Sequence, residues 1–260
     1  MPGDASTGTF LQGLERGLAV IRAFSADAPS LTLSEVARDV GITPATARRI
    51  LLTLEQLGYV RSDGRRFSLT PRVLALGWAY LSSLDLGDIA GPFMEELSAK
   101  TRESCSIATL DLPDIVYVAR VPTSRIMTVA LGVGARLPAY VTSMGRVLLA
   151  GLPEDELSAY LSSLEAEALT EYTVTSVDDL RDVIAKADAD GHALVDQELE
   201  LGLRSIAVPI RDSRGRAVAA LNVSAHASRS TPDSLREDVL EPLRECADQI
   251  GTALRRRGRI

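Results

Sequence analysis

Residues 32–57 carry two closely spaced helix-start signals, and these constrain the N-terminal fold more than any other feature. Thr32 and Glu35 have the spacing of a capping box. A short apolar stripe follows and ends at Gly41, a residue free to adopt a positive φ. Thr43 can cap a second helix, with a proline at its first position. A short helix, a glycine-containing turn and a second helix are the pattern of a helix-turn-helix.

The segments on either side extend this pattern. Apolar residues recur at helical spacing over 10–24, which predicts an amphipathic helix before the pair. Two short strands are predicted at 59–61 and 66–69, around an Asp-Gly turn typical of a hairpin. The second helix of the pair is predicted to end at about residue 57 and to bury Ala47, Ile50, Leu51, Leu54 and Leu57. Together these elements predict a winged helix-turn-helix over residues 8–70.

Charge is distributed unevenly along the chain. The net charge is −7, yet residues 1–83 carry nine Arg against seven acidic residues, whereas the remainder carries 19 basic against 28 acidic residues. This asymmetry indicates an N-terminal module that faces a polyanion, attached to an acidic body. A net +3 over residues 43–66 is also typical of an ordinary solvated face, so charge alone does not decide.

The candidate nucleic-acid contacts follow from the geometry of such a module. The first turns of a recognition helix must carry hydrogen-bond donors, and Arg can contact guanine through two bonds. Wing arginines meet phosphates or the minor groove. We predict DNA contacts from Thr43, Thr46, Arg48, Arg49, Arg61, Arg65 and Arg66. The alternative is a helical subdomain that contacts only protein; salt dependence distinguishes them, because phosphate binding weakens steeply as salt rises.

Residues 71–86 form a predicted linker helix to a second domain over 87–257. Trp78 and Leu81 lie at helical spacing and are predicted dimer contacts; the alternative is that Trp78 packs on its own domain. The second domain is predicted to be α+β, with helices at both ends of an antiparallel sheet, as in small-molecule sensor domains. We expect helices at 88–100, 143–151, 153–161, 177–190 and 234–256, the last kinked by Pro242, and strands at 106–111, 115–121, 126–131, 192–196, 205–211 and 216–224.

A small polar patch is predicted on this sheet. Period-2 counting places Asn222 and Ser224 on one face of their strand, and Ser205 faces them from the partner strand. Small side chains leave volume for a ligand, and a few polar groups give it specificity. Ser143 lies at a predicted helix start, where backbone amides favour an anion. The alternative interpretation is that these polar groups lie at the edge of the hydrophobic core and bond only to one another.

Several motifs carry a resemblance to a known family. They are LERGL at 14–18, TL at 53–54 before GY at 58–59, and ELGLRS at 200–205. The chain resembles the IclR family of bacterial transcriptional regulators over roughly residues 10–256. Within it, five finer motifs resemble the branch that controls the β-ketoadipate pathway of aromatic catabolism, the PcaR, PcaU and PobR branch. They are YLSSL at 80–84, VYVARVP at 116–122, TSMGRVLLAGL at 142–152, ALVDQELELGLRSIAVPIRD at 193–212 and NVSAHASR at 222–229.

The resemblance implies a fold, partners and a site. It implies a GAF- or profilin-like α/β effector-binding domain, a homodimer or dimer of dimers, and double-stranded operator DNA as a partner. It also implies a small carboxylate effector held between the sheet and a helix start. Carried over by position, the effector-binding residues are Ile126, Val129, Ser143, Met144, Leu203, Ser205, Asn222 and Ser224.

The size of the effector follows from one departure within the resemblance. Val195 stands where a glyoxylate- or pyruvate-sensing member has an acidic residue, and Asp196 follows on the opposite face of the strand. This favours a larger, partly apolar acid such as protocatechuate, 4-hydroxybenzoate or β-ketoadipate. The alternative is an acid of an unrelated carboxylate pathway.

Composition disfavours other classes of function. Two cysteines and two histidines, scattered along the chain, make a metal site unlikely and exclude a disulfide framework. Neither histidine has a neighbouring arrangement that indicates a catalytic triad, and no glycine-rich phosphate loop is present. We therefore expect no enzyme activity, no metal and no cofactor. The first ten residues do not resemble a signal peptide and no apolar run spans a membrane, so we expect a cytoplasmic protein with no membrane partner.

Overall fold

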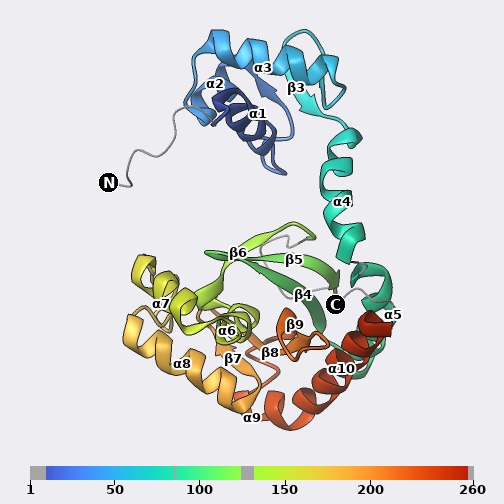
Figure 1. Ribbon diagram of the computed structural model, residues 1–260, viewed down its shortest axis with the longest axis vertical. Helices are drawn as coiled ribbons and strands as arrows, with labels where there is room; N and C mark the ends of the chain where they lie inside the picture. Colours follow the sequence, from blue (N-terminus) through green and yellow to red (C-terminus); the bar gives the residue numbers. More distant parts are fainter. Residues whose placement is uncertain (1–9, 85, 124–131, 257–260) are drawn as a thin grey trace. The chain divides into compact units, whose positions relative to one another are not determined.

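The computed structural model describes residues 10–84, 86–123 and 132–256, and the chain divides into two compact units, Met1–Tyr80 and Leu81–Ile260 (Figure 1). The division falls inside the predicted linker. The domain limits at 8–70, 71–86 and 87–257 stay predictions.

The first unit is a helical bundle with a small sheet. Its three-stranded antiparallel sheet has the order β1-β3-β2. The predicted hairpin accounts for two of these strands, whereas the third was not predicted because it is only two residues long. The elements are α1 (Gln12–Arg22), β1 (Leu31–Thr32), α2 (Leu33–Val40), α3 (Pro44–Gln56), β2 (Val60–Ser62) and β3 (Arg66–Leu69).

The helix-start signals form as predicted. Thr32 Oγ1 accepts a hydrogen bond from the backbone N–H of Glu35, and the Glu35 carboxylate accepts one from the N–H of Thr32. Gly41 ends α2 with a φ of 68°. Thr43 caps α3 by accepting from the N–H of Thr46 at 3.2 Å. These local bonds satisfy N–H groups that a helix start leaves without intrahelical partners.

One part of the predicted buried face of α3 is wrong. Ala47, Leu51 and Leu54 are buried, but Leu57 is 51% exposed. At 3.6 residues per turn, the stripe that starts at 47 continues to residue 58, so Leu57 lies to one side of it.

The second unit contains a six-stranded antiparallel sheet of order β6-β5-β4-β9-β8-β7. A 3-10 turn over Pro71–Val73, in the first unit, leads into α4 (Leu74–Leu84), which begins in the first unit and ends in the second. In the second unit α5 (Leu86–Thr101) follows, and β6 was not predicted because it is short. The strands are β4 (Ser104–Asp111), β5 (Asp114–Val121), β6 (Arg136–Pro138), β7 (Ala193–Asp196), β8 (Leu203–Arg211) and β9 (Ala217–His226). The predicted strand at 126–131 lies outside the described residues.

Helices cover both faces of this sheet (Figure 1). One face packs against α5 and α10 (Leu240–Arg256). The other packs against α6 (Ser143–Ala150), α7 (Glu154–Ser163) and α8 (Val177–Asp190). The predicted α+β class with an antiparallel sheet is confirmed.

The two faces differ in side-chain size. Towards α5 and α10 the central strands present Leu, Ile and Val, whereas towards α6 they present Ala108, Ala207 and Ala220. Strand residues alternate between faces, so this difference is encoded by a period of two. Small side chains on the α6 face allow that helix to approach the sheet closely.

The C-terminal helix is less regular than predicted. A short α9 (Pro232–Ser234) leads into a π-helical turn over Leu235–Val239, and α10 follows. Pro242 therefore lies in the first turn of α10, and the irregularity falls in the turn before it, because proline lacks an N–H and its ring crowds the carbonyl four residues earlier. Among the described residues, none of the helices is long and apolar enough to cross a membrane.

Candidate nucleic-acid interface and ligand cavity

The outer side of α3 presents two arginines and two threonine hydroxyls. Arg48 and Arg49 are exposed, and neither has an ion-pair partner among the described residues. The hydroxyls of Thr43 and Thr46 lie 2.9 Å apart. This end of α3 therefore offers hydrogen-bond donors and positive charge to an incoming anion.

Side-chain hydrogen bonds of Asp63 stabilise the turn of the β2–β3 hairpin. The Asp63 carboxylate accepts hydrogen bonds from the backbone N–H groups of Arg66 at 2.7 Å and Arg65 at 2.9 Å. These bonds hold the pKa of Asp63 below its ordinary value. Arg61 and Arg65 are exposed on the hairpin, at the position of a wing.

Arg66 differs from its neighbours. Its guanidinium donates to the Ser30 hydroxyl at 3.0 Å and to the Ser30 carbonyl at 2.8 Å, and it lies 3.5 Å from the Glu35 carboxylate. These contacts tie the hairpin to the start of α2. The assignment of Arg66 as a DNA contact stays a prediction, but its Nε and Nη2 donors already have partners within the protein.

The predicted polar patch lies at a small cavity in the second unit. The enclosed volume is about 20 Å³, room for about one water molecule. Five of the eight effector-binding residues predicted from the sequence line it: Ser143, Leu203, Ser205, Asn222 and Ser224. Tyr117, Val141, Thr142, Val195 and Leu199 also line it.

Hydrogen bonds order the polar groups of this cavity. The Ser143 hydroxyl, at the start of α6, donates to the Ser205 hydroxyl on β8 at 2.9 Å. The Asn222 carbonyl oxygen accepts from the backbone N–H of Ser106 at 3.1 Å, so its amide nitrogen faces Ser224, 3.1 Å away. Asn222 is 4% exposed and its orientation is set by the neighbouring strand.

The α6 helix reaches the cavity because of a glycine. A Cβ atom built at Gly145 would lie 2.0 Å from the carbonyl oxygen of Ala139. Only glycine permits this approach of α6 to the preceding turn. Thr142 caps the helix by accepting from the N–H of Gly145 at 3.0 Å.

Three predicted effector contacts are not among the residues that line the cavity in the described part of the chain. Met144 is buried in the core beneath α6 and does not line the cavity, because it faces away from Ser143 on the helix. Ile126 and Val129 lie outside the described residues. The assignment of all three stays a prediction.

Most of the additional lining residues come from segments that the sequence analysis did not place at the cavity. Tyr117 shares a face of β5 with Ile115, and burial raises the pKa of its phenol to about 12. Val195 lines the cavity, whereas Asp196 is not among the lining residues and forms an ion pair with Arg204. The opposite orientation expected for these two neighbours is thus observed.

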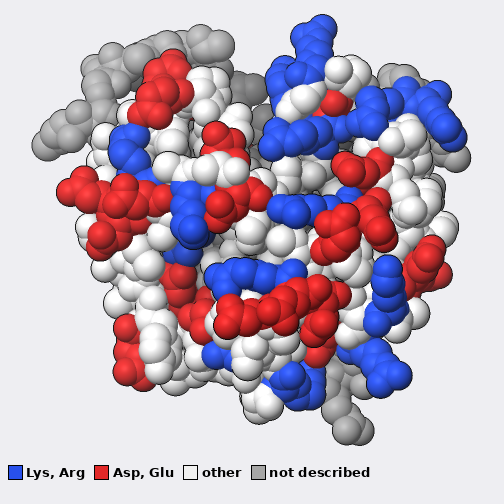
Figure 2. Space-filling view, turned by 90° about the horizontal axis from the view of Figure 1, so that it is seen from below, with Lys and Arg blue, Asp and Glu red and all other residues white. Residues whose placement is uncertain are grey.

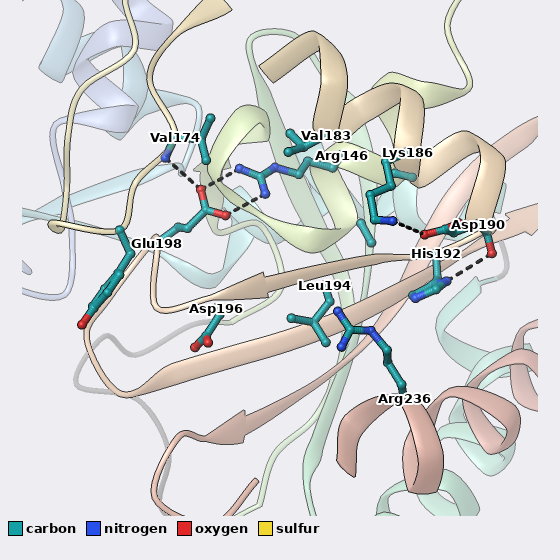
Figure 3. Close-up of a pocket in the computed structure, with 13 residues that line it drawn as sticks. Arg146, Val174, Val183, Lys186, Asp190, His192, Leu194, Asp196, Glu198 and Arg236 are labelled. Carbon is teal, nitrogen blue, oxygen red and sulfur yellow. Dashed lines mark hydrogen bonds and ion pairs between the residues drawn. The ribbon is translucent and has the colours of Figure 1, made fainter. Parts of the chain in front are cut away.

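A second hollow lies on the side of β7 to which Asp196 points, away from the cavity that Val195 lines (Figure 3). Its volume is about 540 Å³, and Asp196 and Glu198 line it together with residues of α8. The Glu198 carboxylate is held by Arg146, which projects from α6. The sequence analysis did not single out this pair.

The surface charge is mixed on the face shown in Figure 2, where acidic and basic side chains are interspersed.

The α4 helix exposes large apolar side chains. Trp78, a predicted dimer contact, is 65% exposed and Leu74 is 72% exposed. The side chain of Leu81, the other predicted contact, lies outside the described structure.

Comparison with protein families gives two matches. Residues 13–64 match the IclR helix-turn-helix domain, and residues 78–252 match the C-terminal region of bacterial transcriptional regulators of the IclR type.

Individual proteins are also similar to the chain. The Pca regulon regulatory protein of Pseudomonas putida is 47% identical over 89% of this chain and 80% of its own length. The p-hydroxybenzoate hydroxylase transcriptional activator of Acinetobacter baylyi is 36% identical over 95% of this chain and 93% of its own. An IclR homolog of Microbacterium hydrocarbonoxydans, solved in complex with 4-hydroxybenzoate, superposes with a TM-score of 0.83, 27% identity and coverage of 94% and 99%.

Proposed function

The chain belongs to the IclR family of bacterial transcriptional regulators, within the branch of the Pca and p-hydroxybenzoate regulators, and on that premise we propose that a hydroxylated aromatic acid controls its binding to operator DNA. The main observation behind this proposal is the cavity beside α6, which is lined by both hydroxyl and amide groups and apolar side chains. Each of its two units has a separate part in this function.

The first unit binds the operator in this proposal. Arg48 and Arg49 on α3, with Thr43 and Thr46, lie at the major groove, while Arg61 and Arg65 meet the backbone beside it. Exposed arginines without ion-pair partners among the described residues support this assignment, because they are free to bind phosphates or bases.

The cavity of the second unit receives the effector. Tyr117, Leu199 and Leu203 supply apolar surface for an aromatic ring. The α6 start supplies partial positive charge for a carboxylate, and Ser205, Asn222 and Ser224 supply hydrogen bonds for ring hydroxyls. Proteins of similar sequence or structure are named for p-hydroxybenzoate or were solved with 4-hydroxybenzoate, which supports the same chemical class.

The site has the composition of a binding site rather than a reaction centre. Among the described residues that line it, none is a cysteine, a histidine or a carboxylate that could serve as nucleophile or general base. We therefore propose that the protein is a regulator without enzyme activity. As a binder of genomic DNA, it would act in the bacterial cytoplasm, as a homodimer or dimer of dimers on a palindrome-like operator.

Calorimetric titration tests the effector class. Protocatechuate, 4-hydroxybenzoate and β-ketoadipate are each titrated into the wild-type protein, Asn222→Ala and the surface control Ser213→Ala, which lies in the exposed β8–β9 turn. We expect saturable binding of an aromatic acid to the wild type and the control, and at least about tenfold weaker binding to Asn222→Ala, since about one to two hydrogen bonds are lost.

Operator binding measured with and without the acid completes the test. Linkage requires that an effector which changes operator affinity binds the DNA-bound and free proteins unequally. Tight binding of the acid with unchanged operator affinity would refute the regulatory coupling. Failure of all three acids to bind would refute the aromatic effector and leave the family assignment intact.

A further inference from the structure

A buried ion pair lies beside the cavity. Arg146 donates to both carboxylate oxygens of Glu198, at 2.7 and 2.6 Å (Figure 3). The two side chains are only 4% and 8% exposed. Two parallel charge-assisted bonds, removed from water, fix the relative position of the elements that carry them.

Those elements are two walls of the cavity. Arg146 lies on α6 and also donates through Nε to the carbonyl of Tyr140 at 3.0 Å, next to the lining residue Val141. Glu198 lies in the segment 195–203, called the strap here, which contributes Val195, Leu199 and Leu203 to the lining. The ion pair therefore joins the α6 wall directly to the strap.

Further hydrogen bonds hold the strap from outside. The backbone N–H of Val174 donates to the Glu198 carboxylate at 3.0 Å. The hydroxyls of Thr170 and Thr173 donate to the carbonyls of Gln197 and Glu198, both at 2.7 Å. Glu198 is thus the point at which α6, the 170–174 segment and the strap meet.

The strap separates two spaces of very different size. The cavity on its inner side encloses about 20 Å³, and the hollow on its outer side about 540 Å³. A benzene-sized ligand needs a space on the order of 150 Å³. The ends of the strap are paired in the sheet, Val195 and Asp196 with β8 and Leu203 with β9, whereas residues 197–202 lie outside the strands, and Glu198 among them borders the open hollow. Outward movement of residues 197–202 would widen the cavity at its lining residue Leu199.

We propose that the Arg146–Glu198 pair is a latch that holds the strap against α6 and so opposes entry of the effector. The inference rests on the proposed function, because it assigns the effector to this cavity. Both residues act by positioning the strap and neither touches the ligand in this proposal. Weakening the latch favours the widened cavity, and a ligand that binds only the widened state then binds more tightly.

Amide hydrogen exchange tests the latch without any effector. Glu198→Gln keeps the shape of the side chain and removes its charge. We expect exchange over 195–203 to become about tenfold faster, with the far end of the β8–β9 hairpin unchanged. Asp212→Asn is the matched control: Asp212 is a buried carboxylate paired with Arg216 at that far end. An unchanged strap, or equal acceleration throughout the domain, would overturn the proposal, because the pair would then serve general stability only.

Titration with 4-hydroxybenzoate or protocatechuate tests the consequence. We expect Glu198→Gln to bind the acid about fivefold more tightly than the wild type, and Asp212→Asn to bind like the wild type. If Glu198→Gln fails to fold, Thr173→Val removes a different tie on the strap and shifts affinity in the same direction by a smaller factor.

The outcomes separate this proposal from the proposed function. Faster exchange of the strap in a protein that binds none of the acids supports the latch and refutes the aromatic effector. Acid binding by the wild type, with equal or weaker binding by folded Glu198→Gln and Thr173→Val, refutes the latch and keeps the effector.

Discussion

Neighbouring arginines of the hairpin, Arg65 and Arg66, have opposite surroundings. Arg65 is exposed, whereas Arg66 is bonded to Ser30 and lies near Glu35. A sequence pattern treats the two alike, since both follow the same turn. Their surroundings differ accordingly: Arg65 stays exposed for the proposed contact with DNA, whereas Arg66 connects the hairpin to Ser30 and Glu35 at the start of α2.

This difference predicts different effects of alanine. Arg65→Ala should weaken operator binding on all sequences alike and lower the slope of log affinity against log salt by about 1, with an unchanged Tm. Arg66→Ala should also lower the Tm, by about 4 °C, because Ser30 and Glu35 lose their partner. Gel-shift titrations over a salt series and thermal unfolding measure both. Equal Tm values for the two variants would contradict the role given to Arg66.

The two thiols are buried in the folded protein. Burial raises the pKa of Cys105 and of Cys246 to about 12, from an ordinary value of 9.0. Each thiol has a backbone carbonyl as its nearest hydrogen-bond partner. Neither is therefore placed to act as a nucleophile.

A pH dependence follows from these shifts. In the unfolded chain the thiols ionise near pH 9, whereas in the folded protein they stay protonated until about pH 12. Because only the unfolded state loses these protons between about pH 9 and pH 12, the free energy of unfolding falls as pH rises through that window. At pH 8 we expect a chromogenic disulfide reagent to label the native protein slowly and the denatured protein at once. Rapid labelling of the native protein would contradict the burial of the thiols.

At the scale of elements, α6 depends on close approach rather than on side-chain bulk. It packs over the alanine face of the sheet, and Gly145 meets the carbonyl of Ala139. The start of this helix also supplies Ser143 to the cavity. Its position therefore affects both the core and the ligand site.

Gly145→Ala should displace the helix. The added methyl group has a backbone atom in its path, so we expect a loss of about 2–3 kcal/mol in unfolding free energy and weaker effector binding. Gly91→Ala in α5 is the control: its Cβ has nothing within 4 Å, and alanine favours helix by up to about 1 kcal/mol. Denaturant titration measures both, and similar stabilities of the two variants would contradict the close approach.

At the scale of the whole molecule, apolar side chains remain exposed on two helices of the first unit. Phe10, Leu14 and Leu18 lie exposed at or near α1, and Leu74 and Trp78 are exposed on α4. Exposed apolar groups at this density are typical of surfaces that bind a partner. Under the proposed binding to a palindrome-like operator, the partner that we expect is a second copy of the chain.

Substitution on α4 tests this assembly. We expect Leu74→Ser with Trp78→Ala to raise the dimer dissociation constant by at least about tenfold, because large apolar side chains carry much of an interface. Operator binding should become less tight in parallel, and the fold of the second unit should be unchanged by circular dichroism. Sedimentation over a concentration series measures the constant. Identical dissociation constants would show that α4 lies outside the interface.

Features that depend on residues close together in the sequence could be predicted from the sequence alone. Capping at Thr32 and Thr43, and the turn at Gly41, depend on residues a few positions apart. The convergence of Ser205, Asn222 and Ser224 follows from strand alternation once two strands pair. The sequence by itself therefore determined the winged pattern, most elements of the sheet domain and the polar floor of the cavity.

The remaining features depend on which elements meet. Arg146 and Glu198 are 52 positions apart, and Arg66 and Ser30 are 36 apart, so no local period relates them. Tyr117 and Leu199 reach the cavity only through the order of strands and the path of the strap. Tertiary structure alone decided these contacts, because hydrogen bonds and packing between distant segments are set by their relative placement and not by their own residues.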